Sequence, residues 1–180
     1  MRILANETIA LCIDIQSKLF PHIHDNQRLE KNARTLIQGL STLSIPIVVT
    51  EQYVKGLGET IESVKEVLPS YSPLEKKCFS CADDEVIFNT IVSYSRKNII
   101  IFGIESHVCV LQTCIDIIER GFTPVVVEDC IGSRKLYDNY VAIERMKKEG
   151  AIIATYESIL FELCRVSGTE TFKTISALVK

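Results

Sequence analysis

The clearest chemical signal in the sequence is Cys109, which follows an apolar segment and opens the stretch CVLQTCIDIIERG. Val110, Ile117 and Ile118 follow it at helical spacing, so we expect Cys109 in the first turn of a helix. Free amides and the helix dipole there lower a thiol pKa from its usual value of about 8.5, and the same amides could hold an oxyanion. The competing interpretation is a small buried apolar residue, the usual state of a reduced cysteine.

The other six cysteines carry weaker signals. An odd total of seven in a chain large enough to build its own core predicts reduced thiols in a reducing compartment, not a disulfide framework. Cys78 and Cys81 form a CFSC pattern that could suggest redox work or a metal, but no second Cys or His pair stands at zinc spacing. We interpret the remaining four as core residues: Cys12, Cys114, Cys130 and Cys164.

Two further residues could exchange protons with a thiol. Asp14 ends an otherwise apolar run in IDIQ, where burial of a carboxylate is unfavourable without a partner; an Asx turn or a helix cap is the alternative. Lys76 and Lys77 lie in a long connection, although most lysines are solvated surface residues. An acid, a lysine and a helix-start cysteine can together activate a nucleophile, but spacing alone does not establish that they meet.

The segments that must position these residues alternate between short apolar runs and longer amphipathic ones. The stretch LEKNARTLIQGLSTL predicts a helix over residues 29–43. Unbroken apolar runs predict strands covered on both faces at residues 8–15, 46–51, 98–104, 123–129 and 151–156. This succession predicts an α/β fold, a three-layer α/β/α doubly wound (Rossmann-like) domain with a mainly parallel sheet.

Residues 52–82 break this rhythm with a Gly- and Pro-containing connection, which we expect to carry function because it is too long for a simple loop. In open α/β sheets, ligands bind beyond the carboxyl ends of the strands where the strand order reverses. If the order is the common doubly wound one, the first strand and the strand at 98–104 are neighbours at that point. Asp14 would then lie beside the segment GIESHVC.

The bulk composition narrows the class of protein. A chain of 180 residues, 47% hydrophobic and 24% charged, fits a single globular domain over residues 1–180. The net charge of −3 and the interspersed charges disfavour nucleic acid as a partner. No apolar run approaches the roughly 18 residues of a membrane span, and the first residues lack the pattern of a signal peptide. We therefore expect a cytoplasmic protein, with an organelle as a further possibility.

Four motifs occur together in the order of a known family: IDIQSKLF (13–20), TEQYVKGLG (50–58), EKKCFS (75–80) and GIESHVCVLQT (103–113). They resemble the isochorismatase-like cysteine hydrolases, as does the later stretch over residues 128–163. The sequence looks closest to the small isochorismatase-domain hydrolases that carry EQYPKGLG and THVC, with Val54 in place of their usual Pro.

The resemblance implies a catalytic triad of Asp14, Lys76 and Cys109, with Lys77 as the weaker choice of lysine. It also implies a non-proline cis peptide between Ile104 and Glu105, and an oxyanion hole made by the backbone amides of Glu105 and Cys109. The aromatic and histidine side chains expected to line the substrate pocket are Phe20, Tyr53, Phe79 and His107.

By this likeness the reaction is acyl transfer through a thioester on Cys109. Asp14 takes the thiol proton, and Lys76 supplies positive charge that lowers the pKa of both partners. The Asp-x-His metal motif of nicotinamidases is replaced by TEQYVKGLG, so we expect no metal, no other cofactor and no action on nicotinamide. True isochorismatases lack the cysteine, so an amide or related small carbonyl substrate is preferred over isochorismate.

Other functions compete with this interpretation. A thiol-reactive or redox-sensing protein would use Cys109 without turnover of a carbon substrate. An inactive scaffold and a nuclease are further alternatives, the first disfavoured by the three triad residue types and the second by the acidic charge balance. The family habit also implies a homo-oligomer, a dimer or larger, although no stripe in the sequence marks an interface.

Overall fold

The computed structural model describes residues 1–180 and contains one six-stranded sheet flanked by eight α-helices. The strands are β1 Thr8–Ile13, β2 Ile47–Gln52, β3 Leu74–Lys76, β4 Asn98–Ile104, β5 Thr123–Gly132 and β6 Ile152–Ala154. The helices are α1 Asn26–Thr42, α2 Val54–Leu57, α3 Glu62–Lys65, α4 Glu85–Ser93, α5 Leu111–Glu119, α6 Leu136–Glu149, α7 Tyr156–Cys164 and α8 Glu170–Leu178.

All strand pairs are parallel, and the strand order is β3-β2-β1-β4-β5-β6. The direction of winding therefore reverses between β1 and β4, where Ile13 pairs with Gly103. This confirms the predicted doubly wound α/β fold and the predicted adjacency of the first strand to the strand at 98–104. In such sheets the reversal leaves a crevice at the carboxyl ends of the central strands.

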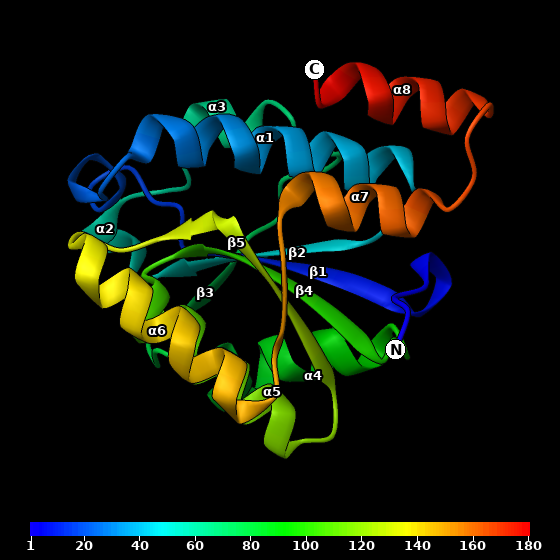
Figure 1. Cartoon of the computed structure of the whole chain (residues 1–180). Helices are drawn as coiled ribbons and strands as arrows, with labels where there is room; N and C mark the ends of the chain where they lie inside the picture. The colour runs from blue at the N-terminus through cyan, green and yellow to red at the C-terminus, as the bar shows by residue number, and fades with distance from the viewer.

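The sheet is covered on both faces (Figure 1). Helices α1, α7 and α8 lie on one side, and α4, α5 and α6 lie on the other. The residues of β1 and β4 are buried throughout, because side chains of alternate direction enter two separate cores. No helix is both long and apolar enough to cross a membrane.

Local signals in the sequence explain where several helices begin and end. Asp84 precedes α4, and its carboxylate accepts hydrogen bonds from the amides of Val86 and Ile87. Thr155 opens α7 with a reciprocal capping box to Ser158. Helix α6 ends at Glu149 and is followed by Gly150, which adopts the left-handed conformation with φ +110°.

One glycine permits the close approach of the two central strands. Gly103 has φ +127°, and a Cβ atom at this position would lie 2.0 Å from the carbonyl oxygen of Ile13. Only a residue without a side chain fits there, because both the backbone conformation and the space exclude one. Gly103 thus allows the pairing with Ile13 at the two strand ends that carry Asp14 and the segment leading to Cys109.

The structure differs from the sequence prediction mainly within residues 52–82. This connection contains the edge strand β3 and the short helices α2 and α3, none of which shows hydrophobic periodicity. A strand of three residues is too short to display an alternating pattern. Strand β1 ends earlier than predicted because Asp14 has φ +52°, and β5 runs on to Gly132 beyond the predicted end at residue 129.

Candidate active site

Asp14 lies directly after β1, at the point where the sheet order reverses, and is only 1% exposed. Its left-handed backbone conformation turns the chain out of the strand, while its amide still donates to the carbonyl of Thr50 at 3.2 Å. The Thr50 hydroxyl donates to Oδ1 of Asp14 at 2.7 Å. Two neighbouring strands therefore hold this buried carboxylate in a fixed orientation.

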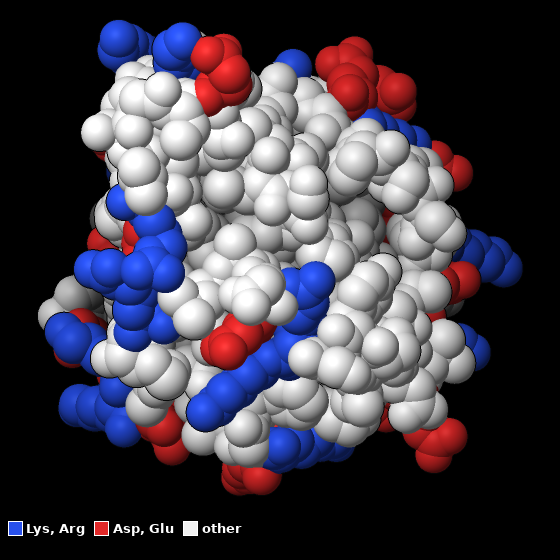
Figure 2. Space-filling model, turned by 90° about the vertical axis from the view of Figure 1, so that its right-hand side faces the viewer, with Lys and Arg blue, Asp and Glu red and all other residues white.

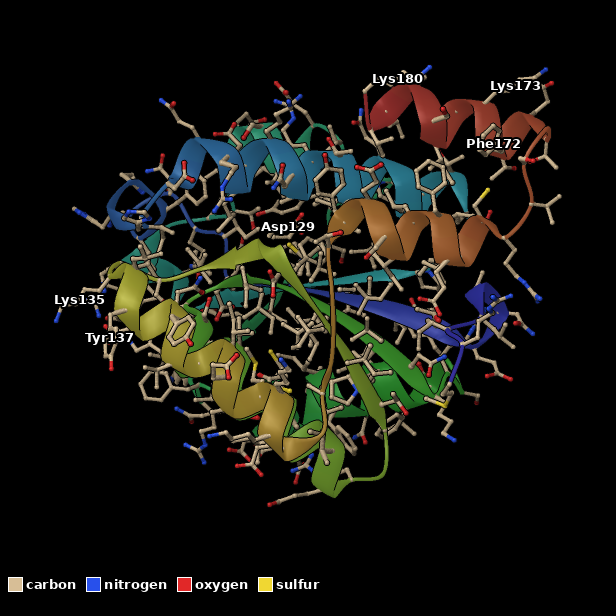
Figure 3. All side chains as sticks on the ribbon, viewed as in Figure 1. Asp129, Lys135, Tyr137, Phe172, Lys173 and Lys180 are labelled. Atoms are coloured by element: carbon tan, nitrogen blue, oxygen red, sulfur yellow. The ribbon has the colours of Figure 1, made fainter.

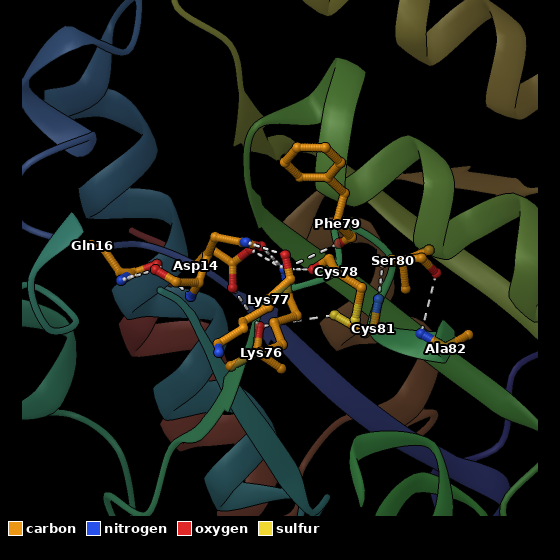
Figure 4. A network of polar contacts seen from close by, with 12 residues as sticks. Asp14, Gln16, Lys76, Lys77, Cys78, Phe79, Ser80, Cys81 and Ala82 are labelled. Atoms are coloured by element: carbon orange, nitrogen blue, oxygen red, sulfur yellow. Dashed lines mark hydrogen bonds and ion pairs between the residues drawn. The ribbon is translucent and has the colours of Figure 1, made fainter. Parts of the chain in front are cut away.

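Lys76 is the last residue of β3, and its side chain is completely buried. Its Nζ lies 2.6 Å from Oδ2 of Asp14 and 2.8 Å from Oε1 of Gln52. The carbonyl oxygens of Phe79 and Cys78 lie at 3.1 Å and 3.3 Å, and Figure 4 shows these contacts converging on the ammonium group. Because an ammonium has only three donors, none is left for a ligand, and Lys76 can act there only through its charge.

The neighbouring lysine points elsewhere. Lys77 is exposed, and its backbone carbonyl accepts a hydrogen bond from the side-chain amide of Gln52 at 2.7 Å. Successive residues of a strand end point to opposite sides, so only one of the two lysines can reach Asp14. That residue is Lys76.

Cys109 lies in a π-helical turn, Ser106–Val110, that joins β4 to α5. The amide of Val110 donates to the carbonyl of Glu105, five residues earlier, at 3.2 Å. Cys109 is 7% exposed and lines a cavity that Asp14 also lines. The helix expected at this cysteine is therefore present, with its first turn wider than an α-helical turn.

The expectation of a lowered thiol pKa is wrong for this site. Burial raises the pKa of Cys109 well above 9.0, the neighbouring Asp14 carboxylate raises it further, and the positive charge of Lys76 only partly opposes this. Burial by itself would lower the pKa of Lys76, because it disfavours the charged ammonium. The attraction to negative groups, Asp14 first among them, is the larger effect in sum, so the pKa of Lys76 is raised. The resting arrangement is a neutral thiol beside a carboxylate–ammonium pair.

The cavity at this site has a volume of about 280 Å³. Most of its wall is apolar, and its polar wall groups are Asp14, Gln52, Glu105 and Arg134. The apolar lining comprises Leu19, Leu57, Phe79, Ile104 and Val108 together with Cys109. A concave, largely apolar space with a few polar groups is typical of a small-molecule site.

One of the four predicted pocket residues lines this cavity. Phe79 does so, and its half-exposed ring points away from the polar network in Figure 4. Phe20 instead packs in the core beneath α1, because the short 3₁₀ turn after β1 directs its ring inward. Tyr53 folds over Gly56. His107 is turned toward the start of α6, where its Nδ1 lies 2.9 Å from the hydroxyl of Ser133.

The peptide bond between Ile104 and Glu105 is cis. The Glu105 carboxylate is almost buried and forms an ion pair with Nε of Arg134 at 2.8 Å. No group of three or more His, Cys, Asp or Glu side chains is arranged to hold a metal ion. The absence of a metal from the reaction stays a prediction.

Comparison with known proteins identifies the family. The profile of the isochorismatase domain matches residues 8–158, which include Asp14, Lys76 and Cys109. The chain belongs to the isochorismatase domain family. It is an isochorismatase-family hydrolase with the three-layer α/β/α fold.

Three relatives span nearly all of this isochorismatase domain. Isochorismatase family protein 1B of Dictyostelium discoideum is 37% identical, covering 97% of this chain and 87% of the relative. The secreted isochorismatase effector Isc1 of Phytophthora sojae is 32% identical, and the match covers 99% of this chain and 87% of the relative. The structure of the MAR1 ribonuclease from Caenorhabditis elegans superposes with a TM-score of 0.93 at 36% sequence identity. The superposition covers 99% of this chain and 92% of the ribonuclease chain.

Sequence reasoning did not single out several residues that surround the candidate site. Thr50 and Gln52 orient Asp14 and Lys76, and Arg134 and the Glu105 side chain form the second ion pair of the cavity. The available signal was positional, since Thr50 lies near the end of the strand predicted at 46–51 and Gln52 directly follows it. Nothing in the local sequence marks Arg134, which reaches the cavity only through the fold.

Proposed function

We propose that this isochorismatase-family protein is a cysteine hydrolase that cleaves a small amide or related carbonyl substrate through a thioester on Cys109. One observation carries the proposal: a buried Asp14–Lys76 ion pair of 2.6 Å lies behind the same cavity of about 280 Å³ into which Cys109 faces. A nucleophile, a base and a charge that steadies the base are the parts that covalent acyl transfer needs.

In the first half of the reaction, Asp14 accepts the proton of the Cys109 thiol, and the sulfur attacks the substrate carbonyl carbon. The backbone amides of Glu105 and Cys109 bind the resulting oxyanion. As the tetrahedral intermediate collapses, Asp14 returns the proton to the leaving nitrogen or oxygen, and the amine or alcohol departs. A thioester remains on Cys109.

In the second half, Asp14 takes a proton from water, which attacks the thioester carbonyl. Collapse of this intermediate breaks the carbon–sulfur bond, releases the acid and returns the proton to the sulfur. Lys76 acts through its charge alone, since its donors are bound to Asp14, Gln52 and backbone carbonyls. This charge favours the developing thiolate, which burial otherwise disfavours. The cycle uses no metal and no cofactor.

The experiment is intact-mass spectrometry of the protein mixed with a panel of small amides and esters, combined with an assay for released amine. We expect an acyl adduct that maps to Cys109 and disappears in Cys109→Ala. Asp14→Asn should slow amine release by about 10²-fold to 10⁴-fold, the usual contribution of a general base. The matched control is Cys114→Ala, another buried cysteine of the same helical segment, which should retain activity. Amine release by Cys109→Ala would refute the mechanism.

A non-hydrolytic thiol sensor remains the competing interpretation of Cys109. The two differ in whether Asp14 controls the sulfur, so the pH dependence of Cys109 alkylation separates them. In the hydrolase, Asp14→Asn should change both the rate and its pH profile. Unchanged profiles together with no turnover of any carbonyl substrate would favour the sensor.

A second candidate activity is RNA cleavage, because a relative 36% identical to this chain is a ribonuclease. The charge distribution does not favour it: the net charge is −3, and positive and negative side chains are interspersed on the face drawn in Figure 2. Incubation with single-stranded and duplex RNA at physiological salt tests it. Cleavage that is lost in Cys109→Ala would place RNA in this same site.

We further propose that residues 1–180 form a single domain that assembles into a homo-oligomer in the cytoplasm. Helix α6 supports the assembly, because it exposes a row of large apolar side chains, including the Tyr137 that projects outward in Figure 3. This row consists of Leu136, Tyr137, Tyr140 and Val141. Light scattering of Tyr137→Ser/Tyr140→Ser against the unmodified chain tests the assembly. Free thiols at all seven cysteines fit a reducing compartment.

A further inference from the structure

Arg134 is the one cationic side chain among the residues that line the cavity. It lies in the short connection between β5 and α6, and its side chain is 57% exposed. Lys76, the other cation of the site, lies behind Asp14 and does not line the cavity. A charged group on a bound molecule would therefore meet Arg134 first.

Glu105 fixes the orientation of this guanidinium. Oε1 of Glu105 accepts from Nε of Arg134 at 2.8 Å and from the Arg134 backbone amide at 3.3 Å. The Glu105 side chain is only 9% exposed, whereas that of Arg134 is much more open. The ion pair thus occupies one edge of the guanidinium and anchors it, and neither Nη nitrogen of Arg134 has a hydrogen-bond partner in the protein.

The donor geometry of the site, rather than its net charge, favours a carboxylate as the ligand group. Asp14 is paired with Lys76 and Glu105 with Arg134, so the two ion pairs are neutral together, and the attraction for an anion comes from the guanidinium itself. The free Nη groups form a planar pair of donors that matches the two oxygens of a carboxylate. Elsewhere the cavity wall is largely apolar, so it offers no second cation for another anionic group.

We propose that Arg134 is a specificity-determining residue that binds a carboxylate on the substrate through its Nη groups. The substrate class is then a small amide or ester with one carboxylate near the scissile carbonyl and an otherwise apolar body. This inference rests on the proposed function for its chemistry, but the binding of a carboxylate by Arg134 can be measured without turnover.

The test compares two alkylating reagents of nearly the same shape, iodoacetate and iodoacetamide. Each reacts when the sulfur displaces iodide and forms a carbon–sulfur bond, but only iodoacetate carries a carboxylate. Alkylation is followed at Cys109 by peptide mapping, since Cys78 and Cys164 are also partly exposed. We expect the ratio of the iodoacetate rate to the iodoacetamide rate to fall at least about tenfold in Arg134→Gln, or 1.4 kcal/mol.

The matched control is Arg145→Gln. Arg145 also has a 57% exposed side chain and an ion pair, with Glu149 at 3.5 Å, and its substitution changes the net charge equally but far along α6. Its rate ratio should stay within twofold of the unmodified protein. Arg134→Lys keeps the charge without the planar fork and should give an intermediate ratio. A ratio in Arg134→Gln that stays within twofold of the unmodified protein would overturn the proposal.

A second measurement does not depend on the reactivity of Cys109. Acetate and the neutral acetamide are titrated against the protein while the Nε–H resonance of Arg134 is followed by NMR. We expect a saturable shift with acetate and none with acetamide. Absence of a saturable acetate shift would overturn the carboxylate site. A cysteine that resists both alkylating reagents while acetate still binds would count against the proposed nucleophile and leave the role of Arg134 standing.

Discussion

Replacement of Lys76 by Met should destabilise the protein strongly, because it leaves the Asp14 carboxylate buried without its partner. The two side chains are 0% and 1% exposed, and their charged atoms are 2.6 Å apart. Removing one partner of such a buried pair typically costs about 3 to 5 kcal/mol. Two of the acceptors around Lys76, Oε1 of Gln52 and the carbonyl of Phe79, lose their donor as well, so the upper half of that range is expected.

The assay is urea unfolding at pH 7, with the free energy of unfolding compared between variants. Lys173→Met is the matched control, because Lys173 pairs with Glu170 at a nearly equal 2.7 Å but on the surface, at 64% and 89% exposure. Surface pairs contribute about 0 to 1 kcal/mol, so this variant should be close to the unmodified protein. The double variant Asp14→Leu/Lys76→Met should recover part of the loss, because no unpaired charge remains buried.

A loss below about 1 kcal/mol in Lys76→Met would refute this reasoning, because it would place the pair in the range of surface ion pairs. An equal loss in the Lys76→Met and Lys173→Met variants would do the same. A single unfolding transition in all variants would also support the proposal of one domain.

Three further predictions concern the same strand ends. Thr50→Val removes the hydroxyl that donates to Asp14. Its free energy of unfolding in urea should fall by about 1.5 to 3 kcal/mol, the range for hydrogen bonds to charged groups. An unchanged free energy of unfolding would mean that other contacts orient Asp14. Burial raises the pKa of Cys109 above its ordinary 9.0, so the folded state keeps a proton that the unfolded chain loses. Stability should therefore be retained below pH 9 and fall as the pH rises above it, measured by unfolding between pH 7 and pH 10, and Cys109→Ala should make the fall shallower. Gly103→Ala should abolish or severely weaken folding, since its Cβ would lie 2.0 Å from a backbone oxygen of β1. Gly121→Ala is the control, because Gly121 also has a positive φ, +84°, but open space around it. This variant should lose only about 1 to 2 kcal/mol of unfolding free energy in thermal or urea unfolding. Similar losses in Gly103→Ala and Gly121→Ala would contradict the close-approach argument.

The raised pKa keeps the Cys109 thiol neutral, whereas the proposed reaction needs a thiolate. The site can meet both requirements. In the cavity, burial stabilises the neutral form of the Cys109 thiol. In the proposed mechanism the thiolate forms only as Asp14 takes the proton and the carbonyl accepts the sulfur. The charge of Lys76, already in place, then needs no rearrangement to stabilise this state.

The sequence by itself was sufficient to predict the elements that span many residues. Unbroken apolar runs predict the long strands β1, β4 and β5, because a strand buried on both faces must be apolar along its length. Amphipathic spacing likewise predicts α1. The motifs and their order were enough to identify the family, and with it the choice of Asp14, Lys76 and Cys109 as the residues to examine.

Only the tertiary structure decided how these residues meet and what surrounds them. The edge strand β3 is too short to show a pattern, so the burial of Lys76 and its four acceptors follow from packing alone. The pKa of Cys109 was predicted with the wrong sign, because a helix terminus is a local feature whereas burial and a neighbouring carboxylate depend on distant segments. The position of Arg134 at the cavity could not be predicted either. Contacts between strand ends depend on the strand order, which no local sequence pattern records.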